Sequence, residues 1–156
     1  MKKEEEEEIS IRDMIIDDLP RVFHLGEEVF TSERFPLMYR TWDQFEIASL
    51  YTTDAEFCVV AERNKKVIGF AMATTIKKSR SAWKYGYLTW LGVKRRYHRH
   101  GVGERLYREV EKRLEEAGIR MMIIDTEQGN IEALNFFKKM GFNAAREHIW
   151  MTKTLK

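Results

Sequence analysis

Apolar and polar residues alternate along several stretches of the chain, and this pattern predicts β-strands. The opening stretch Ile9–Arg12 alternates in this way. The β-branched runs EFCVVAER (56–63) and KVIGFAMATTI (66–76) meet at NKK (64–66) and predict a hairpin. Three further strands are predicted. The first is the aromatic run WKYGYLTWLGV (83–93), and the second is the short apolar run IRMMIID (119–125), which we expect to be buried. The third is the extended C-terminal stretch FNAAREHIWMTKTL (142–155).

Apolar residues three or four positions apart predict two helices in the first third of the chain. Asp17 or Asp18 can cap the first of these helices, which ends near Thr31. The second is predicted for residues 42–51. It opens with TWDQ (41–44), whose threonine and glutamine have the spacing of a capping box.

Two more helices are predicted in the second half of the chain. Residues 104–117 have an apolar face formed by Leu106, Val110, Leu114 and Ala117. Opposite charges four residues apart lie on the outer face of this helix, in the pairs Glu104–Arg108 and Glu109–Arg113. Residues 130–140 form the last predicted helix. Gly118 and Gly141 end the two helices, because glycine readily adopts the left-handed conformation of a helix C-terminus.

The predicted element order is β α α β β β α β α β. Hairpin strands pair antiparallel, whereas the two strands of a strand–helix–strand unit pair parallel. We therefore predict the α/β class, with one mixed, mostly antiparallel sheet and helices on both of its faces. Residues 9–156 form a single domain in this interpretation, and the acidic residues 1–8 form a disordered tail.

Composition narrows the class of protein. The chain has 156 residues, of which 44% are hydrophobic and 33% charged, as in a globular domain. No run approaches the roughly 18 apolar residues of a membrane span, so we expect no membrane partner. The single cysteine, Cys58, excludes an intrachain disulfide and predicts a cytoplasmic protein with a small buried side chain there. His24 and His148 have no paired spacing, so no metal site is predicted.

A basic segment, KRRYHRH (94–100), separates the strand that ends at Val93 from the helix that follows. Gly101 and Gly103 stand where that helix begins. Unpaired N–H groups and the helix dipole favour an anion there, and glycine lets an oxygen-rich group approach the backbone. With cations beside it, this arrangement suits a pyrophosphate. GVGERL (101–106) lacks the third glycine of a dinucleotide fingerprint, and no P-loop motif occurs, so both of those motifs are excluded.

Two motifs in this half of the chain resemble those of the GNAT superfamily of acetyl-CoA-dependent N-acetyltransferases. LGV (91–93) followed by HRHGVG (98–103) is similar to the family's cofactor loop, Q/R-x-x-G-x-G/A after a V/L-x-V strand end. NIEALNFFKKMGF (130–142) is similar to its downstream motif N-x-x-A-x-x-F/Y-F/Y-x-x-x-G-F. The opening IRDMIIDDLPRV (11–22) is also typical of the family, so the resemblance covers nearly the whole chain.

The resemblance implies a GNAT-like fold whose sheet splays at the cofactor site, with acetyl-CoA as the acetyl donor. Backbone amides from Arg99 to Gly103 would hold the pyrophosphate. Backbone groups of Leu91 and Val93 would hold the pantetheine arm and the thioester carbonyl, and the N–H of Val93 would also stabilise the oxyanion. Asn130, which is also a good N-cap, would reach the pantetheine. The implied cofactor-binding residues are Leu91, Val93, His98, Arg99, His100, Gly101, Val102, Gly103, Asn130 and Phe137.

The sequence departs from the family pattern at two of these positions. His98 stands where Gln or Arg is usual, and a histidine still donates to phosphate, but in a pH-dependent way. Phe137 stands where many members have a tyrosine that protonates the leaving thiolate, and a phenyl ring cannot donate a proton. Either another donor serves, or the thiolate leaves without one, which an ordinary thiol pKa of about 8.5 allows.

The acceptor amine must lose a proton before it attacks the thioester, so a carboxylate at the cleft is expected to act as base. Asp125 is the first candidate because it ends an apolar strand and related enzymes that acetylate protein amino termini place a carboxylate there. The alternative is that Asp125 only caps a turn. Glu127 and Glu28 are reserve candidates. We interpret three aromatic residues as packing rather than as a substrate cage, namely Tyr85, Tyr87 and Trp90.

The sequence thus predicts an enzyme that moves an acetyl group to a primary amine by direct attack in a ternary complex. The acceptor, whether a peptide amino terminus, lysine, polyamine or small metabolite, is left open, as is homodimer formation. Phe137 motivates one alternative, a catalytically inactive acyl-CoA-binding or sensor protein. A nucleic-acid partner is not expected, because the net charge is only +2 and the helix after the basic segment is rich in glutamate: Glu104, Glu109, Glu111, Glu115 and Glu116.

Overall fold

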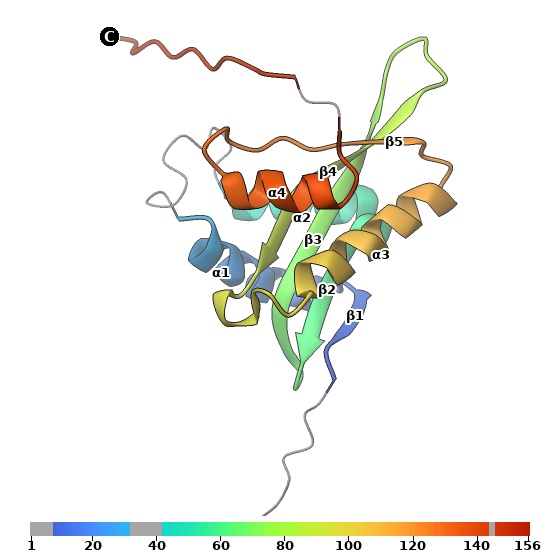
Figure 1. The fold of residues 1–156 in the computed structure, drawn as a ribbon, viewed down its shortest axis with the longest axis vertical. Helices are drawn as coiled ribbons and strands as arrows, with labels where there is room; N and C mark the ends of the chain where they lie inside the picture. Colours follow the sequence, from blue (N-terminus) through green and yellow to red (C-terminus); the bar gives the residue numbers. More distant parts are fainter. Residues whose placement is uncertain (1–7, 32–41, 144–145) are drawn as a thin grey trace, which may run out of the picture. The chain divides into compact units, whose positions relative to one another are not determined.

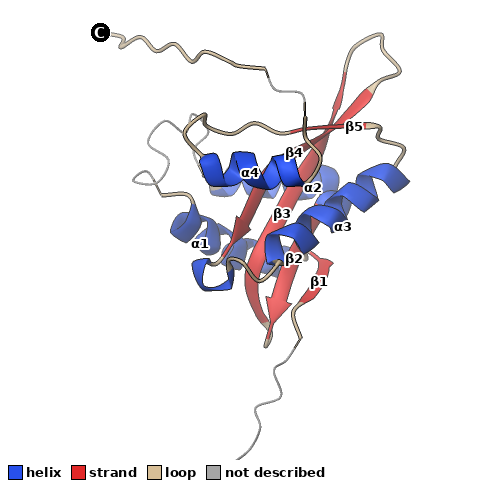
Figure 2. Cartoon of the chain, viewed as in Figure 1, coloured by secondary structure: helices blue, strands red, loops and turns tan. Residues whose placement is uncertain are grey.

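The computed structural model describes residues 8–31, 42–143 and 146–156, which form two compact units divided between Asp125 and Thr126. The first unit holds a five-stranded sheet whose strands lie side by side in chain order (Figures 1 and 2). These strands are β1 (Ser10–Asp13), β2 (Cys58–Arg63), β3 (Lys66–Lys77), β4 (Lys84–Val93) and β5 (Met121–Ile123). Only β4 and β5 pair parallel, so the predicted mixed, mostly antiparallel sheet is confirmed.

Helices cover both faces of this sheet, as predicted. α1 (Leu19–Val29) and α2 (Gln44–Asp54) pack on one face, and α3 (Val102–Glu116) crosses the other (Figure 1). Two neighbouring residues of β3 reflect this division, because adjacent side chains of a strand point to opposite faces. Phe70 belongs to the core shared with α1 and α2, whereas Gly69 lies against α3.

One glycine allows the core between α1 and the sheet to pack closely. A Cβ atom on Gly26 would lie 2.0 Å from the ring of Trp42, so the indole rests directly on the backbone of α1. The Nε1–H of Trp42 donates to the carbonyl of Phe23 at 2.8 Å. The ring centroid of Trp42 lies 5.2 Å from that of Phe30 and 5.0 Å from that of Trp90. This aromatic cluster joins α1 to β4.

The first two helices begin differently from the prediction. α2 begins at Gln44, and its cap is Asp43, whose Oδ1 accepts from the N–H of Phe45 at 2.6 Å. The predicted cap, Thr41, lies outside the described residues. Asp18 precedes α1 as predicted, but its carboxylate does not bond to the first turn of that helix. It accepts instead from the N–H of Ile15 at 2.9 Å, within a short 3-10 turn.

The third helix agrees closely with its prediction. Both predicted ion pairs form, Arg108 with Glu104 at 4.0 Å and Arg113 with Glu109 at 2.8 Å. The helix begins at Val102, two residues earlier than predicted, and its buried face consists of Val102, Leu106, Tyr107, Val110 and Leu114. Ala117 is exposed rather than buried, because the helix has already ended at Glu116 and Gly118 turns the chain away with a φ of 79°.

The β2–β3 connection is the predicted hairpin, closed by a tight turn. Asn64 and Lys65 have φ values of 52° and 58°. Two successive residues in the left-handed region define the type I′ turn, whose twist matches that of the flanking strands. The segment Lys66–Lys77 then forms the longest strand of the sheet.

The strand β5 does not have the burial that we predicted. Met121 and Ile123 remain 47% and 38% exposed. β4 is the only strand that pairs with β5 in the described sheet, so β5 is an edge strand rather than a central one.

The second unit contains α4 (Ile131–Lys139) and the C-terminal stretch. Asn130 caps α4, and Gly141 follows it with a φ of 104°, as predicted. The predicted final strand is wrong for residues 142–143 and 146–156, which belong to no ladder. The alternating pattern around Ile149 favours an extended chain, but a strand also needs a hydrogen-bonding partner, which pattern alone does not supply. Across the described ranges, no helix combines the length and the apolar character of a membrane span.

Candidate functional site

The strand β4 loses its partner on one side halfway along its length. Its ladder with β5 covers Tyr85, Gly86 and Tyr87 and ends at the pair Tyr87–Ile123. A register shift in the β3–β4 ladder leaves Thr89 as an extra residue just beyond that point. Among the described strands, only β3 pairs with the remainder of β4, residues 88–93, so β4 and β5 separate there. The predicted splay in the sheet is therefore present.

The exposed edge of β4 presents the backbone groups that were predicted to hold the donor. The N–H of Lys94 donates to the carbonyl of Ile68 at 2.8 Å, which fixes the hydrogen-bonding phase of this ladder. Because that phase alternates along an antiparallel pair, Gly92 also bonds toward β3. Leu91 and Val93 therefore direct their N–H and C=O groups away from β3, into the gap beside β4.

The connection from β4 to α3 is held by its own histidines. The Nε2 of His98 donates to the carbonyl of Val93 at 2.8 Å, and the Nδ1 of His100 donates to the carbonyl of His98 at 2.8 Å. A carbonyl can only accept, so each of these ring nitrogens carries a hydrogen. His98 thus has a structural contact at the end of β4, in addition to its predicted role toward a phosphate.

Arginine side chains from two separate segments meet at Tyr97 in this connection. The guanidinium carbon of Arg96 lies 4.8 Å from the centroid of the Tyr97 ring, and that of Arg63, from β2, lies 5.9 Å away. Both distances are in the range of a cation–π contact. Arg63 adds positive charge near the cofactor loop. No local motif predicts this contact, because 34 positions separate Arg63 from Tyr97.

The first turn of α3 is open to an approaching anion. Arg99 and Gly101 both have left-handed backbone conformations, with φ values of 63° and 73°. Apart from its chain neighbours and the backbone of its own helix, no described atom lies within 4 Å of the position that a Cβ of Gly101 would occupy. The N–H of Arg105 bonds to the carbonyl of Gly101 at 3.0 Å. The earlier N–H groups of Val102 and Gly103 have no partner in the part of the chain that the structure describes.

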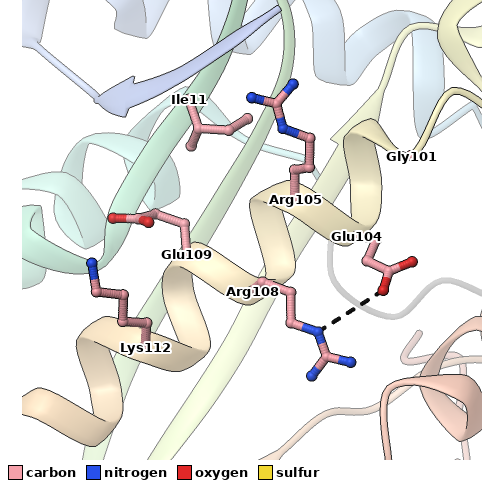
Figure 3. Close-up of a pocket in the computed structure, with 7 residues that line it drawn as sticks. All are labelled: Ile11, Gly101, Glu104, Arg105, Arg108, Glu109 and Lys112. Atoms are coloured by element: carbon pink, nitrogen blue, oxygen red, sulfur yellow. Dashed lines mark ion pairs between the residues drawn. The ribbon is translucent and has the colours of Figure 1, made fainter.

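An open groove of about 650 Å³ runs along α3 from this first turn (Figure 3). Its lining residues are Ile11, Gly101, Glu104, Arg105, Arg108, Glu109 and Lys112. Figure 3 shows Arg105 extending toward Ile11 of β1, whereas Arg108 points away and pairs with Glu104. The cations along the groove are interspersed with carboxylates, so the preference for an anion is confined to the end at Gly101.

The candidate base Asp125 contacts a tyrosine across the gap between the strands. The hydroxyl of Tyr87 donates to Oδ1 of Asp125 at 2.6 Å. Tyr87 is the last residue of β4 that pairs with β5, and Asp125 follows two residues after the end of β5. The two side chains therefore meet where β4 and β5 part. We interpreted Tyr87 as packing from the sequence, because the register of a parallel pair cannot be derived from the residues of either strand.

Three other side chains singled out from the sequence have different surroundings. Glu28 is exposed on α1. Trp90 is buried and donates from Nε1 to Glu46 of α2 at 3.1 Å, as a packing residue with a satisfied polar atom does. Cys58 is fully buried, as predicted, and burial raises the pKa of its thiol to about 12. No cluster of three or more metal-binding side chains occurs among the described residues.

Three candidates belong to the second unit. The Oδ1 of Asn130 accepts from the N–H of Ala133 at 3.2 Å, which confirms the N-cap and leaves the amide hydrogens as donors. The ring of Phe137 packs edge-to-face on those of Phe136 and Phe142, with centroids 5.1 and 5.5 Å apart. The Oε1 of Glu127 is buried without a hydrogen-bond partner in the described ranges.

Comparison with known proteins agrees with this geometry. Residues 17–142 match the Acetyltransferase (GNAT) family, and the chain therefore belongs to that family. A search of curated protein sequences found no match.

Solved structures share the fold at low sequence identity. Among them is an aminoglycoside acetyltransferase from an uncultured soil metagenomic sample in complex with trehalose (TM-score 0.72, 19% identity, 95% of this chain and 97% of that one). Ard1 from Thermoplasma volcanium is similar over 88% of this chain and 84% of its own (TM-score 0.73, 24% identity). PaiA N-acetyltransferase from Thermoplasma acidophilum in complex with coenzyme A is similar over 90% and 93% (TM-score 0.76, 19% identity). These likenesses confirm the predicted GNAT fold.

Proposed function

We propose that this chain transfers the acetyl group of acetyl-CoA to a primary amine by direct attack in a ternary complex. The observation that carries the proposal is the open first turn of α3 at Gly101, in a chain of the GNAT family. The proposal includes a single catalytic domain, residues 9–156, located in the cytoplasm. The acceptor is a peptide amino terminus, a lysine, a polyamine or a small metabolite.

The backbone of the cofactor loop fits a pyrophosphate. The N–H groups of Val102 and Gly103 lie in the first turn of α3 without a partner among the described residues, and the space beside Gly101 is open. A dipole–anion contact of this kind contributes about 0.3–2 kcal/mol, and each charge-assisted hydrogen bond adds to it. Leu91 and Val93 offer their backbone groups to the pantetheine arm and the thioester carbonyl. The amide hydrogens of Asn130 serve the pantetheine in this proposal.

Asp125 is the group to which we assign the acceptor's proton. A lysine-like amine has a reference pKa of about 10.4, so holding it neutral at pH 7 costs about 4–5 kcal/mol. Asp125 is exposed and lies at the gap beside β4, where an amine can reach it. The N–H groups that β4 directs into the gap, those of Leu91 and Val93, are the donors for the negative charge that develops on the carbonyl oxygen during attack. Glu127 remains the alternative base.

The acetyl transfer is tested by the release of coenzyme A thiol with a panel of amines. The panel contains a peptide with a free amino terminus, the same peptide blocked there but carrying a lysine, spermidine and an aminoglycoside. Thiol release with any of these supports the enzyme. If acetyl-CoA binds in calorimetry but none of the amines causes thiol release, the inactive sensor on the same fold is favoured.

The cofactor loop is tested with a matched pair of glycine variants. Gly101→Glu places a side chain and a negative charge at the proposed phosphate site, so we expect loss of acetyl-CoA binding in calorimetry, by 100-fold or more. Gly118→Glu is the control because Gly118 has a similar φ, 79° against 73°, and equally open surroundings. The backbone strain is therefore alike in the two variants. Equal acetyl-CoA affinities in both would refute the phosphate assignment.

A further inference from the structure

We infer that Tyr87 is a catalytic residue that delivers the proton needed by the leaving thiolate. This inference rests on the proposed acetyl transfer. Phe137, the residue at the position where many GNAT enzymes have the proton donor, packs edge-to-face between Phe136 and Phe142 and has no proton to give. The hydroxyl of Tyr87, in contrast, is directly bonded to the candidate base Asp125.

The backbone brings Tyr87 to the right place. Pairing between β4 and β5 ends at Tyr87, and the exposed edge of β4 begins immediately after it. The backbone groups of Leu91, which face the same gap, lie farther along the same strand. A donor arm that lies along this edge with its phosphates at Gly101 therefore points its reactive end toward Tyr87. The half-buried phenol and the exposed Asp125 stand together at the closed end of the gap.

The proton transfers balance without any further reactant. The amine nitrogen bonds to the carbonyl carbon as the carbon–sulfur bond breaks, and Asp125 accepts the proton that the nitrogen loses. Tyr87 gives its hydroxyl proton to the departing sulfur. It then takes the proton held by Asp125 through the existing 2.6 Å hydrogen bond, so that both residues return to their starting states. The net result is one proton moved from nitrogen to sulfur.

The pairing of the two residues matters because a phenol alone is a poor donor to a thiolate. The reference pKa of a phenol, about 10, is higher than that of a thiol, about 8.5, so proton transfer from the phenol to the thiolate is unfavourable by a pKa difference of about 1.5. A carboxylic acid is a much stronger acid than either group, so proton return from Asp125 to the phenolate makes the complete transfer favourable. Tyr87 thus depends on Asp125 for its function.

The test compares Tyr87→Phe with Tyr85→Phe. Tyr85 lies two residues earlier on the same face of β4, where the ammonium group of Lys78 sits 5.4 Å from its ring centroid. Calorimetry with coenzyme A and with desulfo-coenzyme A isolates the contact to sulfur. We expect the wild-type chain to bind coenzyme A roughly 5- to 10-fold more tightly than the desulfo compound. Tyr87→Phe should abolish this difference, and Tyr85→Phe should preserve it.

Kinetics with an amine that the wild-type chain accepts supplies the second readout. Loss of an acid–base group lowers kcat by roughly 100-fold or more, and we expect this for Tyr87→Phe but not for Tyr85→Phe. The double variant Tyr87→Phe, Asp125→Asn should be no slower than Asp125→Asn alone, because the two residues act in one relay. A Tyr87→Phe variant that matches Tyr85→Phe in both readouts refutes the relay alone. A wild-type chain that binds neither coenzyme compound refutes the proposed function itself.

Discussion

At the scale of single residues, the first unit contains a network of three charged side chains around a buried carboxylate. The guanidinium of Arg12 donates to Asp18 at 2.7 Å and to Glu62 at 2.7 Å, and the Asp18 side chain is 1% exposed. Burial opposes the charge on Asp18, but hydrogen bonds from Arg12 and from the N–H of Ile15 outweigh it, so the pKa of Asp18 lies below its ordinary value. The contact joins β1, β2 and the start of α1.

Replacing Asp18 by Asn should lower the free energy of unfolding by about 2–3 kcal/mol at pH 7, because charge-assisted hydrogen bonds are lost. A lowered pKa in the folded state stabilises the protein above the unfolded value, near 3.9, and this contribution disappears as pH falls through the folded value. Urea unfolding of the wild-type chain should therefore show an extra loss of stability on acidification below about pH 4, which Asp18→Asn lacks. Asp17→Asn, an exposed neighbour, is the control. Parallel pH curves for the wild-type chain and Asp18→Asn would contradict this account.

The residue scale is also where sequence reasoning was least complete. The pattern identified Asp18 as a helix cap but not its partner Glu62, because the two are brought together by the β1–β2 register. It likewise predicts Asp125 as a candidate base and Tyr87 as a packing residue, without the hydrogen bond that joins the two. Both omissions concern contacts between residues that are distant in the sequence, and no local spacing encodes such contacts.

At the scale of elements, local sequence is sufficient to predict a feature that depends only on residues within one element or at its ends. The ion pairs of α3, the cap at Asn130 and the glycines that follow α3 and α4 all lie within one helix or at its ends, and all were predicted. The final strand was wrong because pairing needs a second segment. The cap of α2 is Asp43 and not the predicted Thr41, because two side chains of types that suit a cap lie within two positions of each other in the sequence.

The β2–β3 turn provides an element-scale prediction. Lys65 adopts a φ of 58°, where a residue with a Cβ is strained by about 1–2 kcal/mol and glycine is not. Lys65→Gly should therefore raise the free energy of unfolding by about 0.5–1 kcal/mol, after the greater chain entropy of glycine is deducted. Lys66→Gly, at the first residue of β3, should instead lower the free energy of unfolding. Thermal and urea unfolding of the two variants measures both effects, and a destabilised Lys65→Gly would contradict the turn assignment.

At the scale of the whole molecule, the proposed single domain predicts one cooperative transition for residues 9–156. The calorimetric and van't Hoff enthalpies should then be equal, although the chain divides into two units between Asp125 and Thr126. Acetyl-CoA at 100 times its dissociation constant should stabilise the folded state by about 2.7 kcal/mol and shift that transition as a whole. Two separate calorimetric peaks, with only one of them moved by acetyl-CoA, would contradict the single domain.

The direct packing of Trp42 on Gly26 has a consequence for attempts to redesign this protein. An alanine at position 26 cannot be accommodated by a small adjustment, since its methyl group would overlap the indole at 2.0 Å. The indole would have to leave its place, and Phe30 and Trp90 would lose their shared neighbour. Libraries intended to change acceptor preference should thus keep position 26 constant, because even the smallest added side chain there would disturb the support behind β4 before any substrate contact was altered.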